Sequence, residues 1–200
     1  RWQGQCSACK AWNTISEVRL ISASNSTKND RFSGYAGETR AKIQTLSEIS
    51  LQETPRFTSG FKELDRVLGG GIVPGSAILI GGHPGAGKST LLLQVMCGLA
   101  KNMTALYVTG EESLQQVAMR ANRLNLPTDK LNMLSETSVE QICNLADQLK
   151  PQIIVVDSIQ VMHLSDIQSS PGSVAQVREC ASFLTRYAKT RQVAIIMVGH

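Results

Sequence analysis

Short apolar segments alternate with longer amphipathic segments from about residue 56 to the end of the chain. Uninterrupted apolar runs bounded by Gly, Pro or Ser are typical of strands buried on both faces. The amphipathic segments place apolar residues at i, i+3, i+4 and i+7, which predicts helices. Five strands are expected, at 76–82, 104–110, 131–135, 153–158 and 193–200.

Four helices are expected between these strands. Segment 89–101 is too apolar for a surface helix, so we predict that it lies buried within the fold. The other three begin at Ser113, Ser138 and Ser173, and a Gln three residues after each serine gives the spacing of a capping box. Strands that alternate with helices of this length predict right-handed βαβ units. The fold class is therefore α/β, with a mainly parallel sheet flanked by helices.

The first fifty residues lack this alternation. Residues 1–14 combine aromatic residues with one Cys-x-x-Cys pair, and residues 15–50 are rich in Ser, Thr, Asn and Gly, which is typical of a linker. The α/β core is expected at 51–200. The chain begins at Arg1 and stops at His200 directly after an apolar run, so we interpret it as a piece of a longer protein whose core continues.

Composition and charge exclude some classes of protein. The chain is 42% hydrophobic and 18% charged, as expected of a soluble globular protein. It contains no run of about 18 apolar residues that would span a membrane and no apolar stretch of a signal peptide, so we expect a cytoplasmic protein without a membrane partner. The net charge is +4, and residues 51–200 are nearly neutral, so charge alone does not indicate nucleic acid binding.

Residues 82–89, GHPGAGKS, match the phosphate-binding loop G-x-x-x-x-G-K-[ST], between a predicted strand and a predicted helix. Its glycines let backbone N–H groups converge on phosphate oxygens, and the helix adds the positive end of its dipole. Lys88 would reach the β- and γ-phosphates, and the Ser89 hydroxyl would bind Mg²⁺. The expected nucleotide-binding residues are Gly82, His83, Pro84, Gly85, Ala86, Gly87, Lys88, Ser89 and Thr90.

Acidic residues follow two other predicted strands. Asp157 ends IIVVD, where a Walker B carboxylate for Mg²⁺ belongs, because ligands bind at the carboxyl ends of parallel strands. Glu111 and Glu112 follow TALYVTG at the same edge, and hydrolysis needs a carboxylate that orients or deprotonates water. We take Glu111 as the catalytic residue and Glu112 as the alternative. His200 ends the last strand and is either a γ-phosphate sensor or a histidine in solvent.

The five cysteines fall into two groups. Cys97, Cys143 and Cys180 lie in apolar helical patterns and are expected to be reduced thiols in the core. Cys6 and Cys9 precede the α/β pattern, whereas a thioredoxin-like dithiol would open a helix after a strand. A zinc ribbon needs four ligands in two such pairs, so half of a zinc site, a redox pair and two inert thiols remain possible here.

Three longer stretches resemble the RecA family of ATPases. The lead-in to the core, FTSGFKELDRVLGGGIVPGSAILIGGHPGAGKST at 57–90, is similar to that of RecA-family proteins, and so are TGEES at 109–113 and IIVVDSIQ at 153–160. Together with the cysteine pair and SSPGSVAQVRE at 169–179, they make the whole chain resemble bacterial DNA-repair members of this family.

The resemblance implies a RecA-like, DNA-dependent ATPase that acts in DNA repair and homologous recombination as a helicase-like motor of branch migration. It implies ATP and Mg²⁺ as cofactors, Zn²⁺ in the full-length protein, and a homo-hexamer at the bacterial nucleoid. Its partners would be single-stranded and branched DNA and RecA recombinase. Glu111 would be the water-activating glutamate, Asp157 the Walker B acid and His200 the polar switch. Cys6 and Cys9 would form the C-terminal half of a four-cysteine zinc finger.

The sequence also departs from the family pattern. The first Cys-x-x-Cys, a KNRFG motif, the second DNA-binding loop and a C-terminal domain are absent from these 200 residues. We therefore expect this piece to bind ATP, to hold zinc weakly and to fail as a DNA motor. An ATP-dependent regulatory switch on the same core, without DNA translocation, is the alternative. A small-molecule kinase is disfavoured because the sequence has no Arg-rich lid segment.

Overall fold

The computed structural model describes residues 43–50 and 53–200. The chain divides into two units, Arg1–Ser33 and Gly34–His200, and every described residue belongs to the second. The predicted zinc half-site at Cys6 and Cys9 and most of the predicted linker lie outside the described residues. None of the helices in the described ranges is long and apolar enough to cross a membrane.

Five parallel strands form one sheet in the order β1-β5-β4-β2-β3. In this register Gly81 pairs with Gly199 and Thr109 pairs with Asp157, so the strands end together at one edge of the sheet, the carboxyl edge. All five predicted strands and the α/β class are confirmed. The strands are β1 (Ala77–Gly81), β2 (Ala105–Thr109), β3 (Asn132–Ser135), β4 (Ile153–Asp157) and β5 (Ala194–Gly199).

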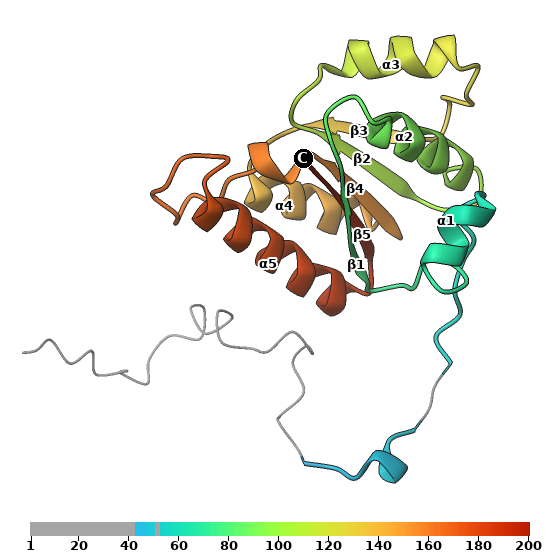
Figure 1. Cartoon of the computed structure of the whole chain (residues 1–200), viewed down its shortest axis with the longest axis vertical. Coiled ribbons are helices and arrows are strands. Elements are labelled where there is room, and N and C mark those ends of the chain that lie inside the picture. The colour runs from blue at the N-terminus through green and yellow to red at the C-terminus, as the bar shows by residue number, and fades with distance from the viewer. Residues whose placement is uncertain (1–42, 51–52) are drawn as a thin grey trace, which may run out of the picture. The chain divides into compact units, whose positions relative to one another are not determined.

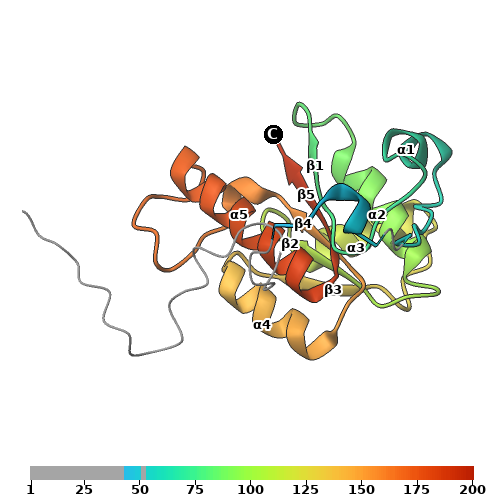
Figure 2. The same ribbon diagram turned by 90° about the horizontal axis from the view of Figure 1, so that it is seen from below.

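Helices cover both faces of the sheet, with α2 (Lys88–Leu99) and α3 (Leu114–Arg123) on one face and α4 (Val139–Leu149) and α5 (Val174–Arg191) on the other (Figures 1 and 2). Neighbouring residues of a strand point to opposite faces. Tyr107 therefore packs in the core beneath α2 and α3, and Leu106 packs in the core beneath α4 and α5. Every residue of β2, β4 and β5 is buried, which explains their continuous apolar runs.

The predicted burial of α2 is confirmed. Leu92, Leu93, Val95 and Met96 are each at most 1% exposed. The three cysteines predicted for the core, Cys97, Cys143 and Cys180, are buried and free. Burial raises the pKa of the Cys143 thiol to about 12 and that of Cys180 to about 11, so both stay protonated and unreactive at neutral pH.

The three serine-capped helices begin where the sequence predicts, and in each the serine side chain accepts from the backbone N–H of the glutamine three residues later. The return bond to the serine backbone N–H differs between them. Ser113 and Gln116 form the complete reciprocal capping box. At Ser138 the backbone N–H instead donates to Glu136 Oε1 at 2.9 Å. The Gln176 side chain binds the preceding loop and not the backbone of Ser173. It accepts from Leu164 N at 3.2 Å and donates to Ser169 O at 2.8 Å. Gln176 therefore fastens loop 164–172 to α5.

The short segments α1 (Lys62–Val67), η2 (Leu46–Glu48) and η3 (Ile159–Val161) were not predicted from the sequence. Helix α1 is only six residues long and buries none of them fully, so it is too short for a periodicity analysis over about 11 to 18 residues. Its segment is held by an antiparallel bridge between Phe57 and Ile72 and by a 2.8 Å bond from Ser59 N to Asp65 Oδ1. This arrangement leads the chain into β1, at the edge of the sheet.

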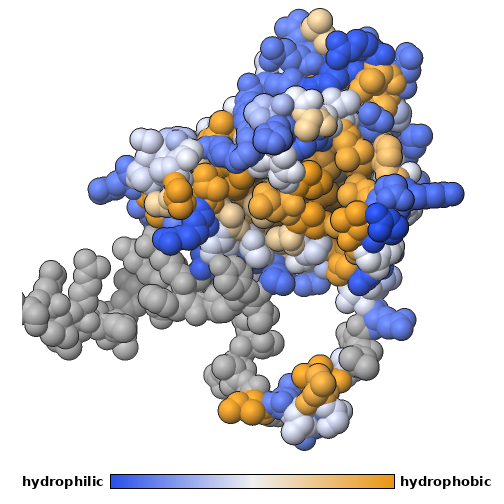
Figure 3. All heavy atoms as spheres, viewed as in Figure 1, coloured by the Kyte–Doolittle hydropathy of each residue, from blue (hydrophilic) through white to orange (hydrophobic). Residues whose placement is uncertain are grey.

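Strand β1 has one neighbour, β5, and its outer side is open in the described part of the chain. Leu79 in the middle of β1 is 65% exposed. Figure 3 shows apolar side chains gathered over this side of the molecule. The three central strands, β2, β4 and β5, are buried throughout, whereas β1 and the other edge strand, β3, contain only half-buried and exposed residues. The burial pattern of β1 therefore reflects its position at the edge.

Candidate functional site

The phosphate loop, residues 82–89, connects β1 to α2 at the carboxyl edge of the sheet. Gly85 and Gly87 have φ angles of +80° and +89°, which residues with a side chain rarely adopt. An added Cβ would meet no atom within 4 Å at either position. The backbone conformation, and not a lack of space, therefore requires glycine there. Such a turn followed by a helix N-terminus is a typical anion-binding element.

Lys88 is the buried residue of this loop, with 9% of its surface exposed. Its ammonium donates to the carbonyl oxygens of Gly82, at 2.6 Å, and His83, at 2.7 Å. An ammonium group has three N–H donors, so two carbonyl bonds leave one for an anion. Lys88 is thus already folded back over the loop, where a phosphate would bind.

A cavity of about 200 Å³ lies against the phosphate loop. Every charged or titratable side chain that lines it is basic, which fits a chain of phosphates. The hydroxyl of Ser89, also in the lining, is an oxygen ligand of the kind that Mg²⁺ prefers. Arg120 of α3 was not predicted from the sequence. The cavity is lined by Gly85, Gly87, Lys88, Ser89, Thr90, Arg120 and His200.

Asp157, the predicted Walker B acid, is 4% exposed at the end of β4. The hydroxyl of Tyr107 on the adjacent strand β2 donates to Asp157 Oδ2 at 2.6 Å. Burial and the negative charge of Asp157 hold the pKa of Tyr107 well above its usual range, so the phenol is the donor of this bond. Sequence reasoning missed Tyr107, because it reads as one more apolar residue of a buried strand.

The two adjacent acids, Glu111 and Glu112, have different partners. Glu111 Oε1 accepts from the Ser158 hydroxyl and lies 3.0 Å from His200 Nε2. Glu112 forms an ion pair with Arg120, whose side chain is 14% exposed. The fold thus brings Glu111 to the ends of β4 and β5 and directs Glu112 toward α3. The predicted site residues Glu111 and His200 are brought together.

No group of three or more His, Cys, Asp or Glu side chains within residues 43–50 and 53–200 could hold a metal ion. This is compatible with Mg²⁺, which is commonly held by one or two carboxylates, phosphates and water. Ser89 and Asp157 offer the hydroxyl and carboxylate oxygens of such a set. The predicted roles of these residues, and the switch role of His200, stay predictions.

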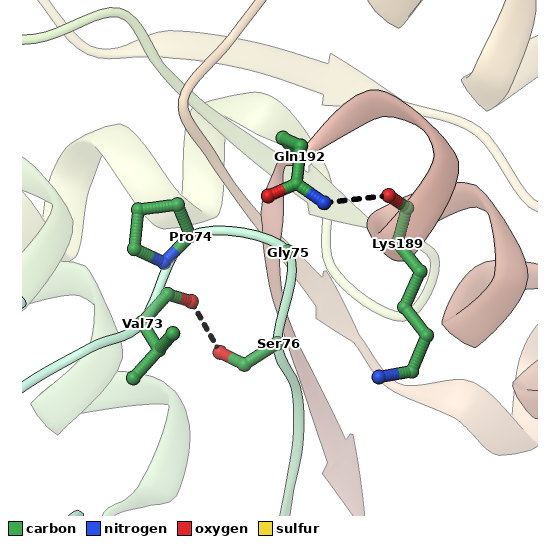
Figure 4. Close-up of a pocket in the computed structure, with 6 residues that line it drawn as sticks. All are labelled: Val73, Pro74, Gly75, Ser76, Lys189 and Gln192. Carbon is green, nitrogen blue, oxygen red and sulfur yellow. Dashed lines mark hydrogen bonds between the residues drawn. The ribbon is translucent and has the colours of Figure 1, made fainter. Parts of the chain in front are cut away.

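A second cavity, of about 280 Å³, lies at the opposite end of β1 and β5 (Figure 4). Its hydrogen bonds are local: Ser76 Oγ donates to Val73 O at 2.6 Å, and Gln192 Nε2 donates to Lys189 O at 2.8 Å. Lys189 is exposed, and no buried charge lies in the lining. The candidate functional site is therefore the smaller cavity. The second one is lined by Val73, Pro74, Gly75, Ser76, Lys189 and Gln192.

Comparisons with known proteins identify the family of the chain. A family model described as "AAA domain" matches residues 43–200. The proteins named DNA repair protein RadA from Haemophilus influenzae, Escherichia coli and Pseudomonas aeruginosa are 93%, 72% and 55% identical to the chain over its whole length. They confirm the resemblance to bacterial DNA repair proteins. The chain covers 43%, 44% and 43% of these relatives, respectively, which is less than half of their length.

Proposed function

Since the chain belongs to the AAA domain family, we propose that it is the ATP-hydrolysing core of a DNA repair protein. One observation carries the proposal: His200 joins the phosphate loop to the candidate catalytic acid. It lines the same cavity as Lys88, and its Nε2 atom lies 3.0 Å from Glu111. A phosphate-binding lysine and a carboxylate at the same edge of the sheet are groups that nucleotide hydrolysis requires.

The phosphate loop would bind the nucleotide through its backbone N–H groups and Lys88. Ser89 and Asp157 would hold Mg²⁺, which neutralises phosphate charge when it is bound. Glu111 would orient the attacking water and accept its proton, because its carboxylate faces the ends of β4 and β5. The contacts of Ser158 and His200 with Glu111 would hold that carboxylate in one orientation.

Glu111 is a better candidate for the base than Glu112. Both oxygens of the Glu112 carboxylate accept hydrogen bonds from Arg120, so they are already engaged and point away from the ends of β4 and β5. The backbone of Glu112 is also fixed, because its N–H donates to Thr109 Oγ1 at 3.0 Å and its carbonyl accepts from the same hydroxyl at 2.9 Å. Glu112 therefore serves to hold α3, through Arg120, beside the phosphate loop.

We further propose that the full-length protein uses this ATPase as a DNA-dependent, helicase-like motor that drives branch migration in homologous recombination. The relatives are named as DNA repair proteins, which supports a role in DNA repair. Single-stranded and branched DNA would be the substrates and RecA recombinase a partner, at the nucleoid. A homo-hexameric ring would complete each ATP site with a residue of the neighbouring copy, and Cys6 and Cys9 would contribute to a Zn²⁺ site of the full-length protein.

Stimulation of ATP hydrolysis by single-stranded DNA tests this function. The full-length protein should hydrolyse ATP faster when single-stranded DNA is added at low salt, where contacts with DNA phosphates are strongest. The stimulation should fall as salt is raised. Hydrolysis that DNA leaves unchanged at low salt would reject the motor and favour the ATP-dependent switch without DNA translocation. An absence of any hydrolysis would reject the ATPase itself.

A further inference from the structure

We propose that Tyr107 is a positioning residue for the magnesium site. Its hydroxyl holds one carboxylate oxygen of Asp157, so that the other oxygen is presented to the ion or to the water bound to it. This inference rests on the proposed function, because it takes Asp157 as a residue that holds Mg²⁺.

The position of the Tyr107 hydroxyl is set by the sheet. Tyr107 lies opposite Val155 in the parallel register of β2 and β4, two positions before the Thr109–Asp157 pair. Its ring lies in the core between the sheet and α2 and is 1% exposed. The hydroxyl therefore reaches along the sheet to the carboxyl edge and donates to Asp157 Oδ2 at 2.6 Å. A ring packed in this way has little freedom to move its hydroxyl.

Asp157 needs such a partner because it is buried. A carboxylate that is 4% exposed loses most of its hydration, and hydrogen bonds must replace it. Residues that hydrogen-bond a metal ligand fix its orientation, and their removal typically weakens metal binding by about 10- to 100-fold. Tyr107 provides this contact from a neighbouring strand, where the backbone holds both residues in register.

The chain contains a matched tyrosine–aspartate pair far from the phosphate loop. Tyr187 on α5 donates to Asp147 Oδ1 at 2.8 Å, on the opposite face of the sheet from Tyr107. Asp147 also pairs with Arg191, and its side chain is 41% exposed. Tyr187→Phe therefore removes the same kind of hydrogen bond as Tyr107→Phe but leaves the candidate site intact.

The experiment measures how Mg²⁺ affects the binding of a fluorescent ADP analogue, in the presence of EDTA and at increasing MgCl₂. In Tyr107→Phe, the Mg²⁺ concentration at half-maximal effect should rise by about tenfold or more. Binding in EDTA should not change, because the phosphate loop is intact. Tyr187→Phe should keep the wild-type midpoint. An unchanged midpoint in a folded Tyr107→Phe chain, checked by circular dichroism, would overturn the inference.

A double-variant cycle separates positioning from a general loss of stability. Tyr107→Phe should shift the Mg²⁺ midpoint of the wild-type chain but add no shift in an Asp157→Asn background. Equal shifts in both backgrounds would show that Tyr107 does not act through Asp157. If the wild-type chain binds the analogue without any Mg²⁺ dependence, the magnesium role of Asp157 in the proposed function fails first. The two failures can therefore be told apart.

Discussion

The cavities at the two ends of β1 differ in chemistry more than in size. The one at the amino end, between residues 73–76 and the end of α5, has a volume of about 280 Å³. The one at the carboxyl edge, against the phosphate loop, has about 200 Å³. Each has a lysine in its lining, and each has a glycine with positive φ, Gly75 at +79° and Gly87 at +89°.

Buried charge separates the two cavities. Lys88 is buried and its ammonium donates to two carbonyl oxygens of the loop, while Lys189 is exposed. The buried carboxylate Asp157 and the Glu112–Arg120 ion pair lie only at the carboxyl edge. Charged groups are costly to bury, so the burial of both Lys88 and Asp157 at one edge of the sheet indicates a charged ligand there. Volume alone would have selected the cavity at the amino end, whose lining contains no buried charge.

The largest effect is expected when Lys88 is replaced, and Lys189 in the other cavity provides the comparison. Lys88→Ala should abolish nucleotide binding at ordinary concentrations and lower ATP turnover by about 10³-fold or more, because the cavity loses the cation that contacts the phosphates. Lys189→Ala, the matched change in the other cavity, should leave both unchanged. Steady-state hydrolysis and titration with a fluorescent ADP analogue measure the two quantities. Normal turnover in Lys88→Ala would remove the phosphate loop from the mechanism.

The second comparison is between Glu111 and Glu112, the two adjacent acids at the carboxyl edge. Glu111→Gln should keep nucleotide binding but lower turnover by about 100-fold or more, because the amide cannot accept a proton from water. Glu112→Gln should have a much smaller effect, since it weakens the pairing with Arg120 but leaves Glu111 in contact with Ser158 and His200. Single-turnover kinetics separates hydrolysis from binding. Undiminished turnover in Glu111→Gln would move the base to Glu112.

The smallest effects concern the two glycines. Gly75→Ala and Gly87→Ala should each lower the free energy of unfolding by about 1–2 kcal/mol, because both positions have a left-handed backbone. At Gly75 the new Cβ would also lie 3.0 Å from Gln192 Nε2. Only Gly87→Ala should weaken nucleotide binding. Urea unfolding and nucleotide titration test the pair, and equal binding by both variants would contradict the difference between the cavities.

Much of the candidate site could be predicted because its signals are local in sequence. The phosphate loop lies within eight consecutive residues, and Asp157 and Glu111 each follow an apolar strand. Parallel strands end at one edge, so the sequence also predicted that these acids lie at the same edge as Lys88. The Ser-x-x-Gln motifs correctly located three helix starts. They did not predict where the Gln176 side chain of α5 would bind, because its partners lie in loop 164–172.

The sequence by itself therefore determined the strands, the helix starts and the residues that can bind phosphate, because periodicity and short motifs depend on neighbouring residues. Only the tertiary structure decided which of these groups contact one another. Tyr107 and Asp157 are 50 positions apart, and Glu111 and His200 are 89 apart. Strand order and register bring such pairs within hydrogen-bonding distance. The same packing assigned Glu111 and Glu112, identical neighbours in the sequence, to different partners.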